Sequence, residues 1–344
     1  MGRAARVTLA AIAAAALIGV PTASASAPAA STPQVKLWTI HYRAHDGKRR
    51  NAYVLLPAWY GKHRHPPIPL IISPHGRGLT GRANSRIWGA LPARGSFAVV
   101  SPDGEGRLFG AYSWGAAGQI ADLARMPEIV RRTLPWMRID RSKIYAFGGS
   151  MGGQESLLLL ARHPHLLAGA AVFDAVTDFV LQYRDFPRIP CDKRCLTAWK
   201  SPIGAVMQIL ARREVGGSPA KAPLAWRMRS PVTYARGIAG SHVPLQLWWS
   251  HKDRIVSDQQ RQTERLVDLI LSINPAAPVE TYDGYWRHSA EMKAKTRLPL
   301  ALANFGLLPG HYSYLARQVH VWPLPPEEPP PPLPGRRPFP RTMH

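Results

Sequence analysis

The segment with the clearest chemical potential is Gly148-Gly149-Ser150-Met151-Gly152. It has the spacing G-x-S-x-G and lies between a predicted strand, 143–147, and a predicted helix, 150–162. Glycines on both sides permit a tight strand-to-helix turn that lifts a serine hydroxyl above a sheet. Ser150 is therefore our candidate nucleophile. The amide of Met151, at the positive end of the helix, is a candidate donor to an oxyanion. The alternative is an ordinary glycine-rich turn with an N-cap serine.

A serine nucleophile also needs a carboxylate that orients its base, and in this arrangement the acid follows the serine along the chain. Asp253 comes just after a tryptophan-rich predicted strand, 245–250, at the strand end where such sheets place functional groups. We therefore predict that Asp253 is the acid. Asp258 is the nearest competitor, but its position predicts an N-cap for the next helix. Asp174 and Asp178, which follow the preceding predicted strand, are less favoured substitutes.

The base is expected last in the chain order, and a histidine suits general-base work near pH 7. His288 lies between the last predicted strand, 278–282, and the last predicted helix, 290–305, so we predict that it is the base. Among the other histidines, His242 and His251 fall before that strand, and His311 and His320 fall beyond that helix.

A second oxyanion donor is expected in the loop after the third predicted strand. Pro74-His75-Gly76-Arg77-Gly78 occupies that place, and its glycines allow close approach of the backbone to a substrate. We predict that the Arg77 amide is the donor, with Gly76 or Gly78 as its neighbours. The Arg77 side chain could also meet an anionic group of a substrate. A plain glycine-rich turn is the alternative.

Short apolar segments alternate with segments of helical spacing along the body of the chain. Residues 176–242, which contain both cysteines, break this alternation and predict a lid-like insertion. The alternation predicts an α/β fold with a mostly parallel central sheet and helices on both faces. The predicted strands are 36–42, 51–56, 68–73, 97–101, 143–147, 168–173, 245–250 and 278–282, and the predicted helices are 119–134, 150–162, 258–273 and 290–305.

The chain resembles the α/β-hydrolases, and among them secreted esterases of the polyhydroxybutyrate-depolymerase and feruloyl-esterase type and the related prolyl-oligopeptidase-like group. The resemblance covers about 36–305 and implies a Ser150–His288–Asp253 triad, acyl-enzyme chemistry on esters, and no cofactor or metal. The chain departs from the family at Arg77 and in the insertion. The matching residues are His75-Gly76, Ile139-Asp140-Arg141-Ser142-Lys143-Ile144-Tyr145, Gly149-Ser150-Met151-Gly152-Gly153, His163-Pro164, Asp253 and His288.

Composition limits the other classes of protein. The 344 residues are 46% hydrophobic, which is too apolar for a disordered chain, and no run of ~20 apolar residues lies in the body. The formal charge of +23 favours association with anionic envelope surfaces, but there is no nucleic-acid-binding motif. The two cysteines, Cys191 and Cys195, are too few for a four-thiolate zinc site and predict a small disulfide.

The ends of the chain differ from its body. Residues 1–27 have a positive start, an apolar stretch and small residues typical of a secretory signal peptide, and an uncleaved anchor is the alternative. A linker, 28–35, leads to an α/β-hydrolase domain, 36–321, and a Pro-rich tail, 322–344. We therefore expect a secreted or envelope-associated protein.

The sequence thus predicts a secreted serine esterase that acts on a small-molecule or polymeric ester. A serine peptidase would share the triad, although the large oligopeptidases usually carry an added propeller that has no room here. A non-catalytic envelope-binding protein on a hydrolase scaffold is the third possibility. The oligomeric state stays open.

Overall fold

The structure is a computed structural model that describes residues 34–107, 110–256 and 258–310, together with the backbone of 320–322. The predicted signal peptide, nearly all of the predicted linker and the tail beyond residue 322 lie outside the described residues. Among the described residues, no helix combines the length and apolar content that a membrane span requires.

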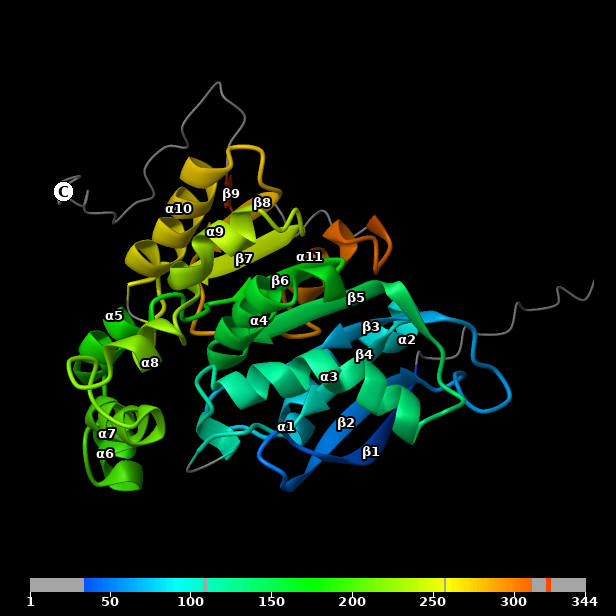
Figure 1. The fold of residues 1–344 in the computed structure, drawn as a ribbon, viewed down its shortest axis with the longest axis horizontal. Coiled ribbons are helices and arrows are strands. Elements are labelled where there is room, and N and C mark those ends of the chain that lie inside the picture. The colour runs from blue at the N-terminus through cyan, green and yellow to red at the C-terminus, as the bar shows by residue number, and fades with distance from the viewer. Residues whose placement is uncertain (1–33, 108–109, 257, 311–319, 323–344) are drawn as a thin grey trace, which may run out of the picture. The chain divides into compact units, whose positions relative to one another are not determined.

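A nine-stranded sheet forms the centre of the described residues, in the order β1-β2-β4-β3-β5-β6-β7-β8-β9 (Figure 1). The pairs β1–β2, β2–β4 and β8–β9 are antiparallel, and all five other neighbouring pairs are parallel. The predicted mostly parallel sheet is therefore confirmed. The strands are β1 (Val35–Arg43), β2 (Arg49–Pro57), β3 (Ile68–Ile72), β4 (Ala98–Pro102), β5 (Ile139–Gly149), β6 (Gly169–Phe173), β7 (Leu245–Ser250), β8 (Val279–Gly284) and β9 (His320–Trp322).

Helices cover both faces of this sheet because successive strand residues point to opposite sides. In β6, Ala170 and Val172 belong to one buried cluster, while Ala171 and Phe173 belong to the other. The first cluster includes residues of α3, α4, α9 and α10, and the second includes residues of α2 and α11. The α-helices are α1 (Gly81–Ser85), α2 (Leu91–Gly95), α3 (Ala117–Thr133), α4 (Met151–Arg162), α5 (Phe179–Asp185), α6 (Lys193–Trp199), α7 (Ile203–Val215), α8 (Pro223–Arg227), α9 (Ala235–Ala239), α10 (Arg265–Ile273) and α11 (Leu298–Asn304).

Three predictions in the C-terminal part of the chain differ from the structure. The helix predicted over 290–305 is only α11, Leu298–Asn304, because the preceding residues form turns and Pro299 occupies the first helical turn. The strand predicted over 278–282 is not the last one, because β9 pairs with β8 through Tyr282 and Val321. The helix predicted over 258–273 is interrupted, since a π-helical segment, Gln260–Glu264, precedes α10.

The insertion, 176–242, carries α5 to α9, and its residues, mainly those of α5, α7 and α8, form most of a third hydrophobic core. Phe179 and Trp226, both fully buried, lie with their ring centroids 4.6 Å apart. This core also contains Met151, the residue after the candidate nucleophile, and Trp114. The insertion therefore packs beside the start of α4, although α6 and α7 lie further from the sheet (Figure 1).

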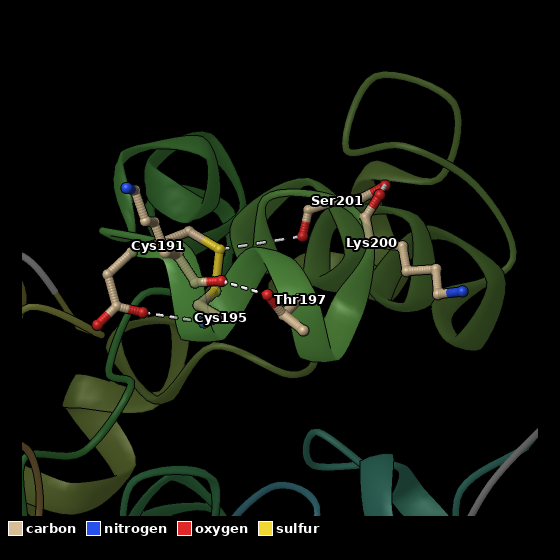
Figure 2. Close-up of a disulfide and its surroundings, with 7 residues drawn as sticks. Cys191, Cys195, Thr197, Lys200 and Ser201 are labelled. Carbon is tan, nitrogen blue, oxygen red and sulfur yellow. Dashed lines mark hydrogen bonds between the residues drawn. A yellow bond between two sulfur atoms is a disulfide. The ribbon is translucent and has the colours of Figure 1, made fainter.

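The predicted disulfide between Cys191 and Cys195 is present (Figure 2). It spans the start of α6, where the Asp192 carboxylate caps the helix by accepting a hydrogen bond of 2.9 Å from the Cys195 amide. Thr197 donates through its hydroxyl to the Lys193 carbonyl, 2.8 Å away, within the same helix. The bridge is therefore local, and both cysteines are half-buried against the hydrophobic core of the insertion.

Replacing both cysteines with serine is expected to lower the free energy of unfolding by no more than about 2 kcal/mol. The closed loop is very short, with a sequence separation of 4, so the bridge removes little entropy from the unfolded chain. Chemical denaturation of the double variant beside the oxidised wild type measures the effect. A loss above about 4 kcal/mol would contradict a merely local role.

Candidate active site

Ser150 occupies a sharp turn between β5 and α4. Its backbone has φ 58° and ψ −125°, a left-handed conformation that residues other than glycine rarely adopt. The turn is held at both ends, because the Ser150 amide donates to the Phe173 carbonyl at 2.8 Å and the Gln154 amide donates to the Ser150 carbonyl at 3.0 Å. The strained serine predicted from the G-x-S-x-G spacing is thus present at the carboxyl edge of the sheet.

Close backbone packing explains the glycines on both sides of this turn. A Cβ at Gly148 would lie 2.2 Å from the Gly152 carbonyl oxygen, and a Cβ at Gly152 would lie 2.3 Å from the Pro74 carbonyl oxygen. Neither approach leaves room for a side chain. The loop that follows β3 therefore rests directly on the first turn of α4.

We expect Gly152→Ala to lower kcat by ~10²-fold and to destabilise the fold by about 1–3 kcal/mol, because the added methyl group displaces the Pro74 loop. Gly237→Ala is the matched control, since a Cβ there would lie 3.6 Å from the nearest atom, the Ala161 carbonyl oxygen. Steady-state kinetics and thermal unfolding of both variants test this. Equal effects at the two glycines would contradict the packing argument.

His288 and Asp253 are brought together from two different loops. The Nδ1 atom of His288 lies 2.7 Å from Oδ2 of Asp253. Because a carboxylate can only accept, Nδ1 carries the proton and Nε2 is left with its lone pair in the neutral imidazole. Asp253 is itself fixed, since its Oδ1 accepts from the amides of Ile255 and Val256 at 2.8 Å and 3.1 Å.

Asp174, one of the substitutes considered for the acid, also lies at this site. It is fully buried directly after β6, and its Oδ2 accepts from the Ser289 amide at 2.6 Å and from Trp286 Nε1 at 3.0 Å. It therefore anchors the loop that carries His288, on either side of that residue. Burial and the charge of Asp253 raise the pKa of Asp174 to about 8, so the group is largely neutral at pH 7.

The other two acidic candidates have structural partners instead. Asp178 caps α5 by accepting from the amides of Val180 and Leu181, both at 3.0 Å. Asp258 accepts hydrogen bonds of 3.3 Å from the amide and the guanidinium group of Arg261, while Gln259 is the N-cap of the π-helical segment that follows.

The loop around His288 lies against the serine turn. The Ser289 hydroxyl oxygen is 3.2 Å from the place that a Cβ of Gly149 would occupy. The structure thus gathers the end of β5, Asp174 after β6, Asp253 after β7 and His288 after β8 at one edge of the sheet, although these residues are far apart in the sequence. This is the edge at which parallel sheets place ligands.

The charged groups around His288 change the pKa of its imidazole. Burial lowers the pKa of His288, but the charge of Asp253 and the hydrogen bond to it outweigh burial and raise the pKa above the ordinary histidine value, and Asp174 adds a smaller contribution to the extent that it is ionised. The positive charge of Arg77 opposes that rise. Two carboxyl groups and one guanidinium group therefore act on the same imidazole.

The loop after β3 reaches the serine as predicted. A Cβ at Gly76 would lie 4.0 Å from the Ser150 Cβ. The Gly78 amide donates to the Ala111 carbonyl at 2.9 Å, so Gly78 is not available as an oxyanion donor. Met151 is the first residue of α4, where amide groups lack an intrahelical acceptor. The amides of Arg77 and Met151 thus remain the candidate donors.

Sequence reasoning missed a buried network behind this turn. Glu155, on α4, accepts from the Ser113 hydroxyl, from the Gly115 amide at 3.3 Å and from Gln119 Nε2 at 3.2 Å. Burial raises the pKa of its carboxyl group to about 7. The signal available in the sequence was a single acidic residue, Glu155, directly before the apolar run Leu157-Leu158-Leu159-Leu160. The network fixes the loop at Trp114 against α4.

The arrangement offers little to a metal ion. Polar atoms of Asp174, Asp253 and His288 lie within 4.8 Å of one another. The Oδ2 atoms of both aspartates and the Nδ1 atom of His288 are, however, already engaged in hydrogen bonds within the protein. These three side chains are therefore arranged as a hydrogen-bonded acid–base group.

A surface hollow lined by Tyr145, Leu245 and Val279 lies at the opposite, amino-terminal edge of the sheet, remote from this acid–base group.

The sheet order, the flanking helices and the strained serine turn define the α/β-hydrolase fold. No family model and no curated protein matches the sequence. Among solved structures, the chain is similar to an acylaminoacyl peptidase in complex with Z-Gly-Gly-Phe-chloromethyl ketone, with TM-score 0.57 and 16% identity over 79% of this chain and 41% of that one.

Two further structures share the fold. One is dipeptidyl peptidase 4 of Porphyromonas gingivalis, with TM-score 0.53 and 16% identity over 82% of this chain. This chain spans only 35% of that peptidase. The other is the fluorophosphonate-binding serine hydrolase FphF of Staphylococcus aureus, with TM-score 0.52 and 15% identity over 74% of this chain and 92% of that one.

Proposed function

We propose that the protein is a serine hydrolase that cleaves carboxylic esters through an acyl-enzyme. The observation that carries the proposal is the strained Ser150 turn beside the hydrogen-bonded His288–Asp253 pair. A lone serine is a weak nucleophile, and a neutral imidazole oriented by a carboxylate is the usual means of activating it.

In the proposed mechanism, Nε2 of His288 removes the proton from the Ser150 hydroxyl as the oxygen attacks the ester carbonyl. Asp253 holds the imidazole in the required tautomer and stabilises the imidazolium that forms. His288 then gives this proton to the departing alcohol, which leaves the acyl group on Ser150. In the second half, His288 removes a proton from a water molecule as the water oxygen attacks the acyl carbonyl, and it then returns that proton to the Ser150 oxygen as the acid departs.

The amides of Met151 and Arg77 are proposed to stabilise the oxyanion in both halves. Both are backbone groups on rigid segments, one on α4 and the other in the loop that packs against it. Such preorganised donors contribute because they need no rearrangement as charge develops. Loss of one donor of this kind typically costs ~10²–10³-fold in rate.

An assay of matched substrates tests the choice of ester over amide. The purified chain is offered 4-nitrophenyl esters of increasing acyl length and aminoacyl-4-nitroanilides, with Ser150→Ala as the blank. We expect serine-dependent hydrolysis of the esters. Turnover of the anilides alone would replace the esterase proposal with a peptidase, and no turnover together with no active-site labelling would favour a non-catalytic binding protein.

The raised pKa of His288 predicts the pH dependence. The base must be neutral, so kcat/KM should fall as the pH drops through a pKa above the ordinary value of 6.5. A raised pKa moves this loss to higher pH, because protonation begins earlier as acid is added. Measurement of kcat/KM from pH 5 to 9 checks it, and an acidic limb centred below ~6 would contradict the expected effect of the two carboxyl groups.

We also propose that the protein is exported and works near an anionic envelope. The N-terminal segment typical of a signal peptide, the disulfide and the charge of +23 support this proposal. The proposed chemistry requires no cofactor or nucleic acid. Fractionation of cells that express the full chain locates the mature protein, and retention in the cytoplasm would overturn export.

A further inference from the structure

Arg77 is a half-buried arginine that forms no ion pair with a carboxylate among the described residues. Three other half-buried arginines each pair with an acid: Arg50 with Asp46 at 2.7 Å, Arg229 with Glu214 at 3.7 Å, and Arg297 with Glu291 at 2.5 Å. A further one, Arg162, donates to the Met228 carbonyl and the Tyr234 hydroxyl. Arg77 instead has a hydrogen bond to the Tyr112 side chain.

A single phenol oxygen uses little of the capacity of a guanidinium group, which presents five N–H donors in a planar fork. A cation that is partly withdrawn from water and has no counter-ion is costly to maintain. Burial accordingly lowers the pKa of Arg77. Such a group is stabilised when an anion enters and accepts two parallel hydrogen bonds.

The position of Arg77 links this unpaired charge to the reaction centre. Its loop lies next to Ser150, since a Cβ at the preceding Gly76 would be 4.0 Å from the Ser150 Cβ. The side chain also acts on the candidate base, because its charge lowers the pKa of His288. An anion bound by the guanidinium group would therefore lie beside the ester bond to be cleaved.

We propose that the Arg77 side chain is a specificity-determining group that selects esters bearing a second, anionic group, a carboxylate or a phosphate, near the scissile bond. The inference rests on the proposed esterase function and deepens it by naming the substrate class. Neutral esters would still reach the serine, but without the charge-assisted pair that holds an anionic substrate in place.

The test compares pairs of substrates that differ in charge at one end. Mono-4-nitrophenyl adipate and a 4-nitrophenyl ester with a terminal phosphate are each compared with neutral 4-nitrophenyl hexanoate. The measured quantity is the ratio of kcat/KM for the anionic ester to that for the neutral one. The variant is Arg77→Met, which keeps the backbone amide, and Arg77→Lys is the second variant in case the first does not fold. Arg82→Met, which removes an exposed positive charge on α1 five residues further along, is the control.

We expect wild type and the Arg82 control to prefer at least one anionic ester, and Arg77→Met to lower that ratio by about 10- to 100-fold. The anionic ester whose kcat/KM ratio falls further in Arg77→Met shows whether the guanidinium group selects a carboxylate or a phosphate. An equal loss of kcat/KM on neutral and anionic esters would overturn the proposal, because the guanidinium group would then stabilise the oxyanion or the fold and not the anionic end of the substrate. A wild-type ratio no higher than that of Arg77→Met would also overturn it. Failure of the wild type on every ester would instead remove the proposed function.

Discussion

Replacing His288 with alanine is expected to lower kcat by ~10⁴–10⁶-fold while leaving the protein folded, because Ser150 then has no group to accept its proton. His288 is only partly buried, with a side chain 18% exposed, so its removal should cost little stability. The measurement is single-substrate kinetics on a 4-nitrophenyl ester, with a thermal melt to confirm folding.

His251→Ala is the matched control for that result. His251 also follows β7 and forms a hydrogen bond with a buried carboxylate, Asp283, but sequence order excludes it as the base. Its loss should reduce kcat by less than ~10-fold. A larger loss at His251 than at His288 would mean that the two His–Asp pairs have been assigned the wrong way round.

Asp253→Asn should lower kcat by ~10⁴-fold, whereas Asp174→Asn should lower it by less than ~10-fold. An amide at position 253 can donate a hydrogen bond to Nδ1 and so stabilise the tautomer that leaves no lone pair for the serine proton. An asparagine at position 174 keeps an oxygen that can accept from the Ser289 amide and Trp286 Nε1.

The charge of Asp174 gives a second reason for this contrast. Its pKa of about 8 means that the group is mostly protonated at pH 7, so the neutral amide is a close substitute. Kinetics of the two variants at pH 7 decide between the carboxyl groups. Comparable losses at both positions would make Asp174 part of the acid function, and a larger loss at position 174 would transfer that function to it.

Local sequence rules explain why much of this site could be predicted. The G-x-S-x-G turn must be flanked by small residues, and its chain order relative to an acid and a histidine follows from the order of the strands. Both Asp253 and His288 could therefore be selected by their places after strands, and the structure joins them at 2.7 Å. The strained Ser150 turn, the parallel sheet and the disulfide were predictable from similarly local patterns in the sequence.

The features that could not be predicted depend on tertiary contacts. The loop before α11 is wound into turns in part because Asp174, more than a hundred residues earlier, accepts the Ser289 amide. Three-residue β9 is too short to give a periodic signal and is defined by its pairing with β8. The anchoring role of Asp174 likewise requires knowledge of which loops meet, although its place directly after a predicted strand was a usable sign.

The most direct test of the central claim is labelling with a fluorophosphonate, which reacts with an activated serine, followed by peptide mass spectrometry. We predict one covalent adduct on Ser150, none in Ser150→Ala, and a greatly slowed reaction in His288→Ala. Absence of an adduct on folded wild-type protein, or an adduct on another serine that persists in Ser150→Ala, would contradict the assignment of Ser150 as the nucleophile.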